Sequence, residues 1–207
     1  MRVFVAINLP SDFFFSVKDY LAKWEELCKD FRWVYKESIH ITLNFFSEIE
    51  DNRIELLKEI IEKSILDFHK IRFSIGNILY LPYGKYRRGE FTYQKKMNGL
   101  ALEINKGKLE LQNLSEKIEN NLINIGKHNY YSFRQKENRQ YLPHITIARK
   151  GRIPMEKCVS QIKDLPFVIE GVADNVTIFK SELYKGNPNR QHKEISIYTP
   201  IKVFSLE

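Results

Sequence analysis

The sequence predicts an α+β fold of two similar lobes that pack as one unit. Two observations lead to this prediction. First, the order strand, helix, strand, helix, strand occurs twice along the 207 residues. Second, several strands follow one another without a helix between them, which is typical of antiparallel sheets. No low-complexity linker divides the chain, so residues 1–207 are expected to form a single bilobal domain.

Each element of the first half is predicted from a local pattern. Residues 1–9, MRVFVAINL, are rich in β-branched and aromatic residues and are expected to form a strand. Pro10 and Ser11 then begin a helix that runs to about Phe31, in which apolar residues recur every three or four positions. The elements expected after this helix are a short strand, a turn and a second strand within 32–46, a helix at 54–68, a strand at 70–82 and a hairpin tip at 84–94.

The second half repeats this order from a new strand onward. The elements expected in it are a strand at Leu100–Ile104, a helix from about 109 to 125, a polar loop at 126–139, the strand HITIAR at 144–149, a shorter helix from Pro154, and final strands within 167–184 and 193–204.

Composition narrows the class of partner. The formal charge is +7 and aromatic residues make up 13% of the chain, a balance that suits a polyanion such as RNA. The stretch YGKYRRGEFTYQKK at 83–96 is basic with interleaved aromatic residues, so it is either an RNA-steering hairpin or a solvated one. No apolar run reaches the roughly 20 residues that span a bilayer. A cytoplasmic protein without a membrane partner is therefore expected, with Cys28 and Cys158 as free thiols.

Two short strands carry the same polar pair. In HITL, alternation along a strand puts His40 and Thr42 on one face and the branched apolar residues on the other. In HITI, His144 and Thr146 share a face in the same way. A single His-x-Thr is uninformative, but two copies in matching contexts, one in each half, indicate a shared function.

Such a pair of motifs fits one kind of chemistry. Two imidazoles that face each other across a cleft can act as general acid and general base near neutral pH. Neighbouring threonine hydroxyls can donate hydrogen bonds to the oxygens of a phosphate. This arrangement suits attack on a phosphodiester without a metal or another cofactor. The alternative is that both histidines are structural, with their hydrogen bonds satisfied at strand edges.

Other cofactor and metal sites are not indicated. His69, His128 and His192 lie outside the repeat and are expected to be structural or exposed. No spacing of His, Cys and carboxylate residues suggests zinc. The sequence also lacks the Gly-x-x-x-x-Gly-Lys-[Ser/Thr] loop of ATP-dependent ligases and kinases.

The two tetrapeptides resemble the paired H-x-[T/S]-x signature of the 2H phosphoesterase superfamily. Within it, the chain is most similar to the RNA 2′,3′-cyclic phosphodiesterases, also called bacterial and archaeal 2′-5′ RNA ligases. The resemblance covers nearly the whole chain, through MRVFVAINLP, FRWVYKESIHITLNFF, YLPHITIARK and VTIFKSELYKG. It implies a LigT-like fold of two pseudo-symmetric βα lobes, each contributing one histidine to a central cleft.

The resemblance also implies an activity. The expected reaction is metal-independent hydrolysis of an RNA 2′,3′-cyclic phosphate end to a 2′-phosphomonoester by a monomer, with weak, reversible 2′-5′ ligation. His144 is expected to be the base and His40 the acid, while Thr42 and Thr146 hold the phosphate. Two alternatives stay open: cleavage of 2′-5′ oligoadenylates or of a small cyclic nucleotide, and an RNA-binding module that turns over slowly or not at all.

Three positions near the motifs need separate comment. Asn44 stands where relatives commonly have a basic residue, and Leu142 where they often have arginine, so both departures are expected to remove positive charge near the site. Arg149 matches a frequent Ala-Arg and is a candidate substrate contact. Strict alternation would put it on the face opposite His144, so it reaches the substrate only if a bulge redirects it; otherwise it braces the structure.

Overall fold

A nine-stranded sheet forms the centre of the molecule. A computed structural model describes residues 1–29, 31–35, 38–46, 48–87, 90–128, 141–149, 168–185 and 194–207. The strands are β1 (Val3–Asn8), β2 (Arg32–Trp33), β3 (His40–Phe46), β4 (Ile71–Arg87), β5 (Glu90–Ile104), β6 (His144–Arg149), β7 (Ile169–Ala173), β8 (Asn175–Lys185) and β9 (Glu194–Ser205).

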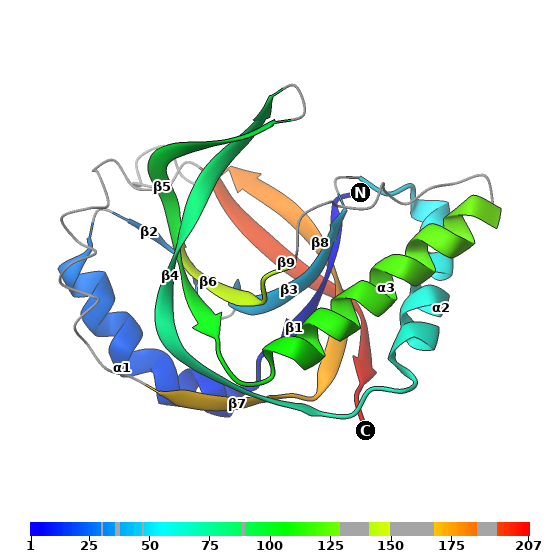
Figure 1. Ribbon diagram of the computed structural model, residues 1–207, viewed down its shortest axis with the longest axis horizontal. Coiled ribbons are helices and arrows are strands. Elements are labelled where there is room, and N and C mark those ends of the chain that lie inside the picture. The colour runs from blue at the N-terminus through cyan, green and yellow to red at the C-terminus, as the bar shows by residue number, and fades with distance from the viewer. Residues whose placement is uncertain are drawn as a thin grey trace.

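All recorded strand pairs are antiparallel, in the order β7-β4-β5-β6-β3-β1-β8-β9, and β2 pairs with β6 outside this path. The sheet curls strongly, with helices on its outer side (Figure 1). The two strands that begin with His-Ile-Thr, β3 and β6, lie together at the middle of the order. The predicted α+β class with antiparallel strands is confirmed, and its two halves meet at these central strands.

The helices match the predicted segments except at their ends. They are α1 (Ser11–Leu27), α2 (Ile54–Ile65) and α3 (Lys108–His128), preceded at α2 by the short 3-10 turn η2 (Asp51–Arg53). Helices α1 and α2 end earlier than expected, and α3 extends three residues into the predicted loop. Helix α1 stops earlier than expected because Cys28 leaves helical geometry, with φ −127° and ψ 50°. The chain then turns so that Phe31, which is 5% exposed, packs in the core.

Each half of the sheet is covered by a helix that follows the other half in sequence. Helix α1 follows β1 but lies against the β4–β7 side, where the rings of Phe13 and Phe73 are 5.6 Å apart. Helix α3 follows β5 but lies over β3, where the hydroxyl of Ser115 donates to the carbonyl of Leu43 at 2.9 Å. Helices α2 and α3 also pack on each other. Each of these two helices therefore connects the two halves of the sheet, because it packs on the half that does not contain the strand before it (Figure 1).

Strand β1 is buried on both faces, which explains its apolar sequence. Val3, Val5 and Ile7 belong to the main core between the sheet and the helices. Phe4 and Ala6 point to the opposite, concave face, where they form a small second cluster with Phe179. Apolar packing therefore extends onto the face that carries the site.

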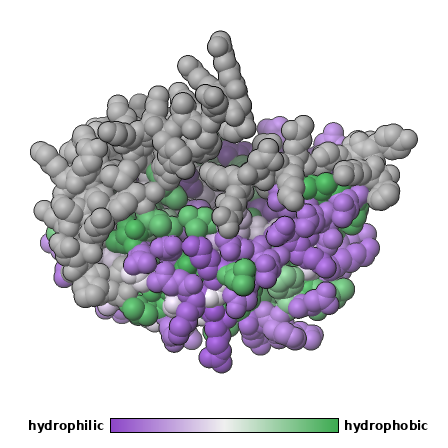
Figure 2. Space-filling view, in the orientation of Figure 1, coloured by the Kyte–Doolittle hydropathy of each residue, from purple (hydrophilic) through white to green (hydrophobic). Residues whose placement is uncertain are grey.

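Among the described residues, the face of the molecule seen in Figure 2 is mainly polar. In Figure 2 the part of the visible face over α3 is mostly hydrophilic, with scattered hydrophobic groups elsewhere. Among the described helices, none is long and apolar enough to cross a membrane. His69 is exposed, as expected.

Several sequence predictions fall on the remaining residues. The segment 129–139 of the predicted loop, the helix expected from Pro154, and His192 lie outside the described residues, as does the side chain of His128. Residues 83–87 and 90–96 of the basic stretch lie on the parts of β4 and β5 that rise above the sheet (Figure 1), but their side chains are likewise not described. Cys28 takes part in a disulfide, so the expectation of a free thiol there was wrong. The other cysteine, Cys158, lies outside the described residues.

Candidate active site

A single cross-strand pair brings the two motifs together. Ile41 of β3 is paired with Ile145 of β6 in an antiparallel register, and both side chains are fully buried. Antiparallel continuation of this register puts His40 beside Thr146 and Thr42 beside His144, on the face opposite the two isoleucines. The two imidazoles then stand on a diagonal of this block. Diagonal neighbours lie about 7–8 Å apart, which leaves room between them for a phosphate.

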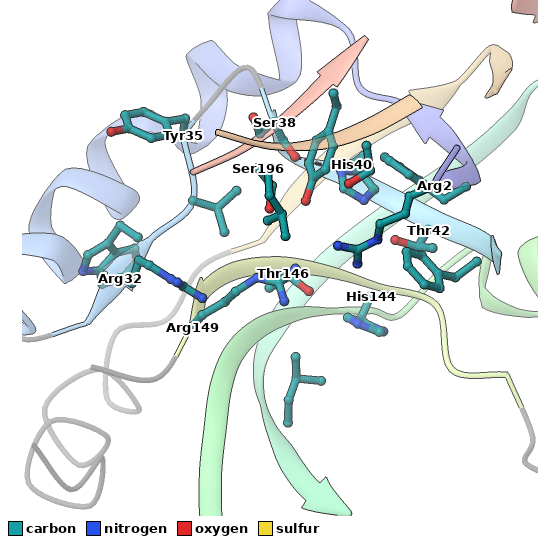
Figure 3. Close-up of a pocket in the computed structure, with 18 residues that line it drawn as sticks. Arg2, Arg32, Tyr35, Ser38, His40, Thr42, His144, Thr146, Arg149 and Ser196 are labelled. Atoms are coloured by element: carbon teal, nitrogen blue, oxygen red, sulfur yellow. Dashed lines mark hydrogen bonds between the residues drawn. The ribbon is translucent and has the colours of Figure 1, made fainter. Parts of the chain in front are cut away.

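The four side chains line one pocket of about 680 Å³ on the concave face. Figure 3 shows Thr42, His40, Thr146 and His144 around a common space, with Arg149 reaching towards it from β6. Sequence reasoning named all five of these residues, and the structure brings all five to the same pocket. What each of them does there is taken up below.

Both imidazoles are held in the same way by the chain just before them. The Nδ1 atom of His40 lies 2.8 Å from the carbonyl oxygen of Ser38, and Nδ1 of His144 lies 2.8 Å from that of Leu142. A carbonyl oxygen only accepts hydrogen bonds, so Nδ1 carries the proton and donates it in both cases. This leaves Nε2 of each neutral ring as an acceptor. The repeated geometry therefore orients two equivalent basic nitrogens.

The surroundings of His40 are aromatic. Its ring centroid lies 4.8 Å from that of Phe4 and 5.3 Å from that of Tyr198, with Phe179 at 6.4 Å. The pKa of His40 is lowered from 6.5 to about 4, and burial is the largest cause. The hydrogen bond to the Ser38 carbonyl opposes this shift, and repulsion from Arg149 and His144 adds to it. His40 is therefore neutral at pH 7 in the empty pocket.

A bulge in each central strand redirects the residues that follow the motif. On β3, Ala6 pairs with Thr42 but Val5 pairs with Asn44, so one extra residue interrupts the alternation. On β6, the corresponding irregularity lies between Thr146 and Ala148. As a result Arg149 returns to the pocket face, and of the two sequence-based possibilities, redirection by a bulge is the correct one.

The same bulge removes Asn44 from the site. Its side chain is 2% exposed and does not line the pocket, and its Oδ1 atom has no hydrogen-bond partner among the described residues. Leu142 is 40% exposed and also lies outside the pocket lining, where it contributes its backbone carbonyl to His144. Neither side chain therefore lines the pocket, and the expected effect of the two departures on the charge near the site stays a prediction.

Two pocket arginines were not singled out from the sequence. The guanidinium of Arg2, just before β1, points into the middle of the pocket (Figure 3) and lies 5.8 Å from the ring centroid of Phe45. Arg32, on β2, lines the end of the pocket near Arg149. Their only sequence signal is a position at the start of a predicted strand, which many surface arginines share. The pocket lining among the described residues includes three arginines and no acidic residue.

Tyr141 ties the chain before β6 to β3. Its hydroxyl donates to the carbonyl of Thr42 at 2.6 Å, and burial raises its pKa. Gln112 of α3 in turn donates to the Tyr141 carbonyl at 2.8 Å. This chain of contacts positions the segment from which His144 projects. Among the described residues, no cluster of three or more His, Cys, Asp or Glu side chains is arranged to hold a metal ion.

Comparison with known proteins finds relatives that share one name. The chain is 29% identical over 194 residues to an RNA 2′,3′-cyclic phosphodiesterase of Methanocaldococcus jannaschii, an alignment that covers 91% of this chain and 95% of that protein. It is 25% identical over 190 residues to a protein of the same name from Thermotoga maritima, covering 91% of this chain and 90% of that one. No protein-family model matches the sequence.

Solved structures share the fold. TT0787 of Thermus thermophilus superposes with a TM-score of 0.72 at 17% identity, covering 100% of this chain and 98% of that one. LigT of E. coli, in complex with 3′-AMP, gives a TM-score of 0.64 at 18% identity, covering 99% and 97%. The likeness therefore extends over the whole curled sheet and its helices.

Proposed function

The chain belongs to the 2H phosphoesterase superfamily, and from this premise we propose that it hydrolyses the 2′,3′-cyclic phosphate at an RNA end to a 2′-phosphomonoester. The observation that carries the proposal is the Ile41–Ile145 pair, which aligns two His-x-Thr motifs on one pocket wall. Relatives named RNA 2′,3′-cyclic phosphodiesterase over nine-tenths of the chain support the same reaction.

The reaction needs two proton transfers on opposite sides of the phosphorus atom. A base removes a proton from water as its oxygen bonds to phosphorus, and the bond from phosphorus to O3′ breaks. An acid gives its proton to the departing O3′, which leaves the phosphate on O2′. Two imidazoles on the diagonal of one block are suited to these two roles. Because they supply both transfers, the proposed mechanism uses no metal and no other cofactor.

We assign His144 as the base and His40 as the acid. The low pKa of His40 bears on this assignment, because an acid must carry a proton that His40 lacks in the empty pocket. A bound phosphodiester anion would offset the repulsion from Arg149 and His144 that contributes to this low pKa. We therefore propose that His40 takes up its proton together with the substrate. A low intrinsic pKa then makes it a strong donor to O3′.

The remaining charged and hydroxyl groups hold the phosphate. The hydroxyls of Thr42 and Thr146 flank the two imidazoles and are suited to donate to the non-bridging oxygens. Arg149, close enough to His40 to depress its pKa, supplies positive charge on the β6 side. Arg2 does so from the centre of the pocket. Fixed donors of this kind stabilise the charge that develops on the phosphate in the transition state.

Further properties belong to the same proposal. A 5′-hydroxyl that attacks in place of water would give weak 2′-5′ ligation at this site. We further propose that the enzyme is a cytoplasmic monomer. Crystal structures show E. coli LigT in complex with 3′-AMP and with ATP, and a nucleotide-binding pocket is what the proposal requires of this chain.

One assay series tests the function. The protein is incubated with EDTA and, separately, with a nucleoside 2′,3′-cyclic phosphate, an RNA that ends in a cyclic phosphate, and a 2′-5′ oligoadenylate. The expected product of the first two is a 2′-phosphate, identified by NMR or chromatography, and it should be lost in both His40→Ala and His144→Ala. Turnover retained in either variant would overturn the two-histidine mechanism. Binding of the RNA without turnover by the intact protein would favour an RNA-binding module instead.

A further inference from the structure

Two arginines face each other at one end of the pocket. Arg32 of β2 is paired directly with Arg149 of β6 in an antiparallel register. Residues directly opposite in such a pair project from the same face of the sheet. Arg149 lines the pocket, and Arg32 lines it as well. Figure 3 shows the two side chains extending next to each other from β2 and β6, with the tip of Arg149 beside Thr146.

This pair is electrostatically unfavourable without an anion. Like charges directly opposite each other destabilise an antiparallel strand pair. Within the described part of the chain, neither guanidinium forms an ion pair or a hydrogen bond, and no lining residue is acidic. Both side chains are exposed to the solvent that fills the pocket. The arrangement therefore keeps two unneutralised cations together on the wall of a site proposed for a phosphate.

One scissile phosphate does not account for both charges. The reacting block of two histidines and two threonines is adjacent to Arg149, whereas Arg32 lies beyond Arg149 at the outer end of the pocket (Figure 3). Tyr35, which is 55% exposed, lines the same end. A guanidinium and an exposed aromatic ring that line one end of a pocket are the groups that bind the backbone and a base of single-stranded nucleic acid.

We propose that Arg32 binds a second phosphate of the substrate, the one on the 5′ side of the nucleotide whose cyclic phosphate reacts. Arg149 lies between the two phosphates and Tyr35 offers a surface for a base. This inference rests on the proposed function and specifies its substrate class. The preferred substrates are cyclic-phosphate ends that carry a 5′-phosphate or an internucleotide phosphate, rather than free nucleoside cyclic phosphates.

The test compares three substrates that differ only on the 5′ side. They are a nucleoside 2′,3′-cyclic phosphate, the same compound with a 5′-phosphate, and a dinucleotide with a cyclic end. The intact enzyme is expected to favour the last two by roughly ten-fold or more in kcat/KM. Arg32→Gln should remove most of this preference, with Arg32→Lys intermediate. It should also weaken the salt dependence of kcat/KM for the dinucleotide, because one contact between opposite charges is lost.

The matched control is Arg72→Gln. Arg72 is an exposed arginine on β4 and does not line the pocket. It should leave all three kcat/KM values and the salt dependence unchanged. Equal use of the three substrates by the intact enzyme would overturn the inference. So would an unchanged preference in Arg32→Gln. If the dinucleotide and the 5′-phosphorylated compound are used equally, the position recognises a phosphate rather than an RNA chain.

Calorimetry separates this inference from the proposed function because it does not need turnover. Binding of a nucleoside 2′,5′-bisphosphate is compared with that of the 2′-monophosphate, for the intact protein and for Arg32→Gln. Tighter binding of the bisphosphate that depends on Arg32, without hydrolysis of any cyclic substrate, would support the second phosphate site and contradict the proposed reaction. Hydrolysis of the cyclic substrates without any such difference in binding would support the proposed reaction and contradict the second phosphate site.

Discussion

Phe45 and Arg149 occupy matching positions, five residues after His40 and His144, and both line the pocket. Each arrives there because a bulge interrupts its strand between the threonine and the fifth residue. The two motifs are alike in their imidazole and hydroxyl groups, and they differ at this position in charge. The β6 side of the pocket therefore carries a cation five residues after its histidine, and the β3 side carries an aromatic ring at the same position.

Removal of the Arg149 charge should affect both catalysis and the titration of His40. Arg149→Gln is expected to lower kcat/KM by about 10²-fold, as for the loss of one donor to a developing negative charge. It should also raise the pKa of His40, because Arg149 is one cause of its depression. The pKa should stay below 6.5, since burial is the larger cause. NMR titration of His40 measures the shift, and an unchanged pKa would mean that Arg149 does not act on this ring.

A sulfur-containing substrate can distinguish the acid from the base. If the bridging O3′ is replaced by sulfur, the leaving thiolate needs no proton. His40→Ala should lose about 10²- to 10⁴-fold on the oxygen substrate and recover most of this loss on the sulfur substrate. His144→Ala should remain slow on both. Steady-state rates of the two variants on the two substrates provide the measurement. Recovery of His144→Ala alone would exchange the two roles.

Stability should depend on pH through His40. The unfolded chain binds a proton at this histidine below about pH 6.5, whereas the folded chain resists protonation until about pH 4. The unfolded state therefore holds more protons in this window, and the free energy of unfolding falls as the pH drops through it. The loss is at most about 3 kcal/mol.

His40→Gln is the control for this pH effect, because it keeps a polar side chain that does not titrate. Denaturant unfolding from pH 7 to pH 4 should show a steeper loss of stability for the intact protein than for the variant. Parallel curves for the two proteins would indicate that His40 has an ordinary pKa in the folded state.

Asn44 and Thr42 offer a contrast within one strand. Asn44→Leu keeps a similar branched shape and removes a buried amide oxygen without a hydrogen-bond partner among the described residues, so activity should stay within about two-fold. Thr42→Val is nearly isosteric and removes a hydroxyl that lines the pocket, so kcat/KM should fall by about 10²-fold. Equal losses in the two variants would mean that Asn44 acts on the substrate after all.

The sequence revealed the four motif residues because their pattern is doubled and each polar pair sits among buried apolar neighbours. It did not reveal the consequences of the bulges. Alternation is the default for a strand, and neither Leu43-Asn44 nor Ile147-Ala148 carries a residue that marks a bulge. Asn44 was therefore expected near the substrate, and the direction of Arg149 stayed open.

Arg2 and Arg32 were missed for a different reason. Each belongs to the site only through strand pairing over long sequence distances, Arg32 with Arg149 and the β1 segment with β3 and β8. Local patterns predict that these segments are strands, but they do not say which strands become neighbours. The end of α1 also differed from prediction. Cys28 leaves helical geometry where the chain turns to bury Phe31, and the helical spacing of apolar residues does not show this turn.

The Tyr141 hydroxyl is expected to act on catalysis through position rather than contact. It donates to the Thr42 carbonyl and so connects β3 to the segment before His144. Tyr141→Phe removes this bond and leaves a buried carbonyl with one partner fewer, at a cost of about 1 kcal/mol in stability. Because Tyr141 does not line the pocket, KM should change little while kcat falls.

The sulfur substrate provides the readout that a loss of stability alone would not move. If Tyr141 positions His144 as the base, Tyr141→Phe should be impaired to the same degree on the oxygen and sulfur substrates, because the base is needed for both. Gln112→Leu, which removes the contact of α3 with the Tyr141 carbonyl, should show the same pattern more weakly. Recovery of Tyr141→Phe on the sulfur substrate would instead mean that the bond supports His40, through the strand that carries Thr42.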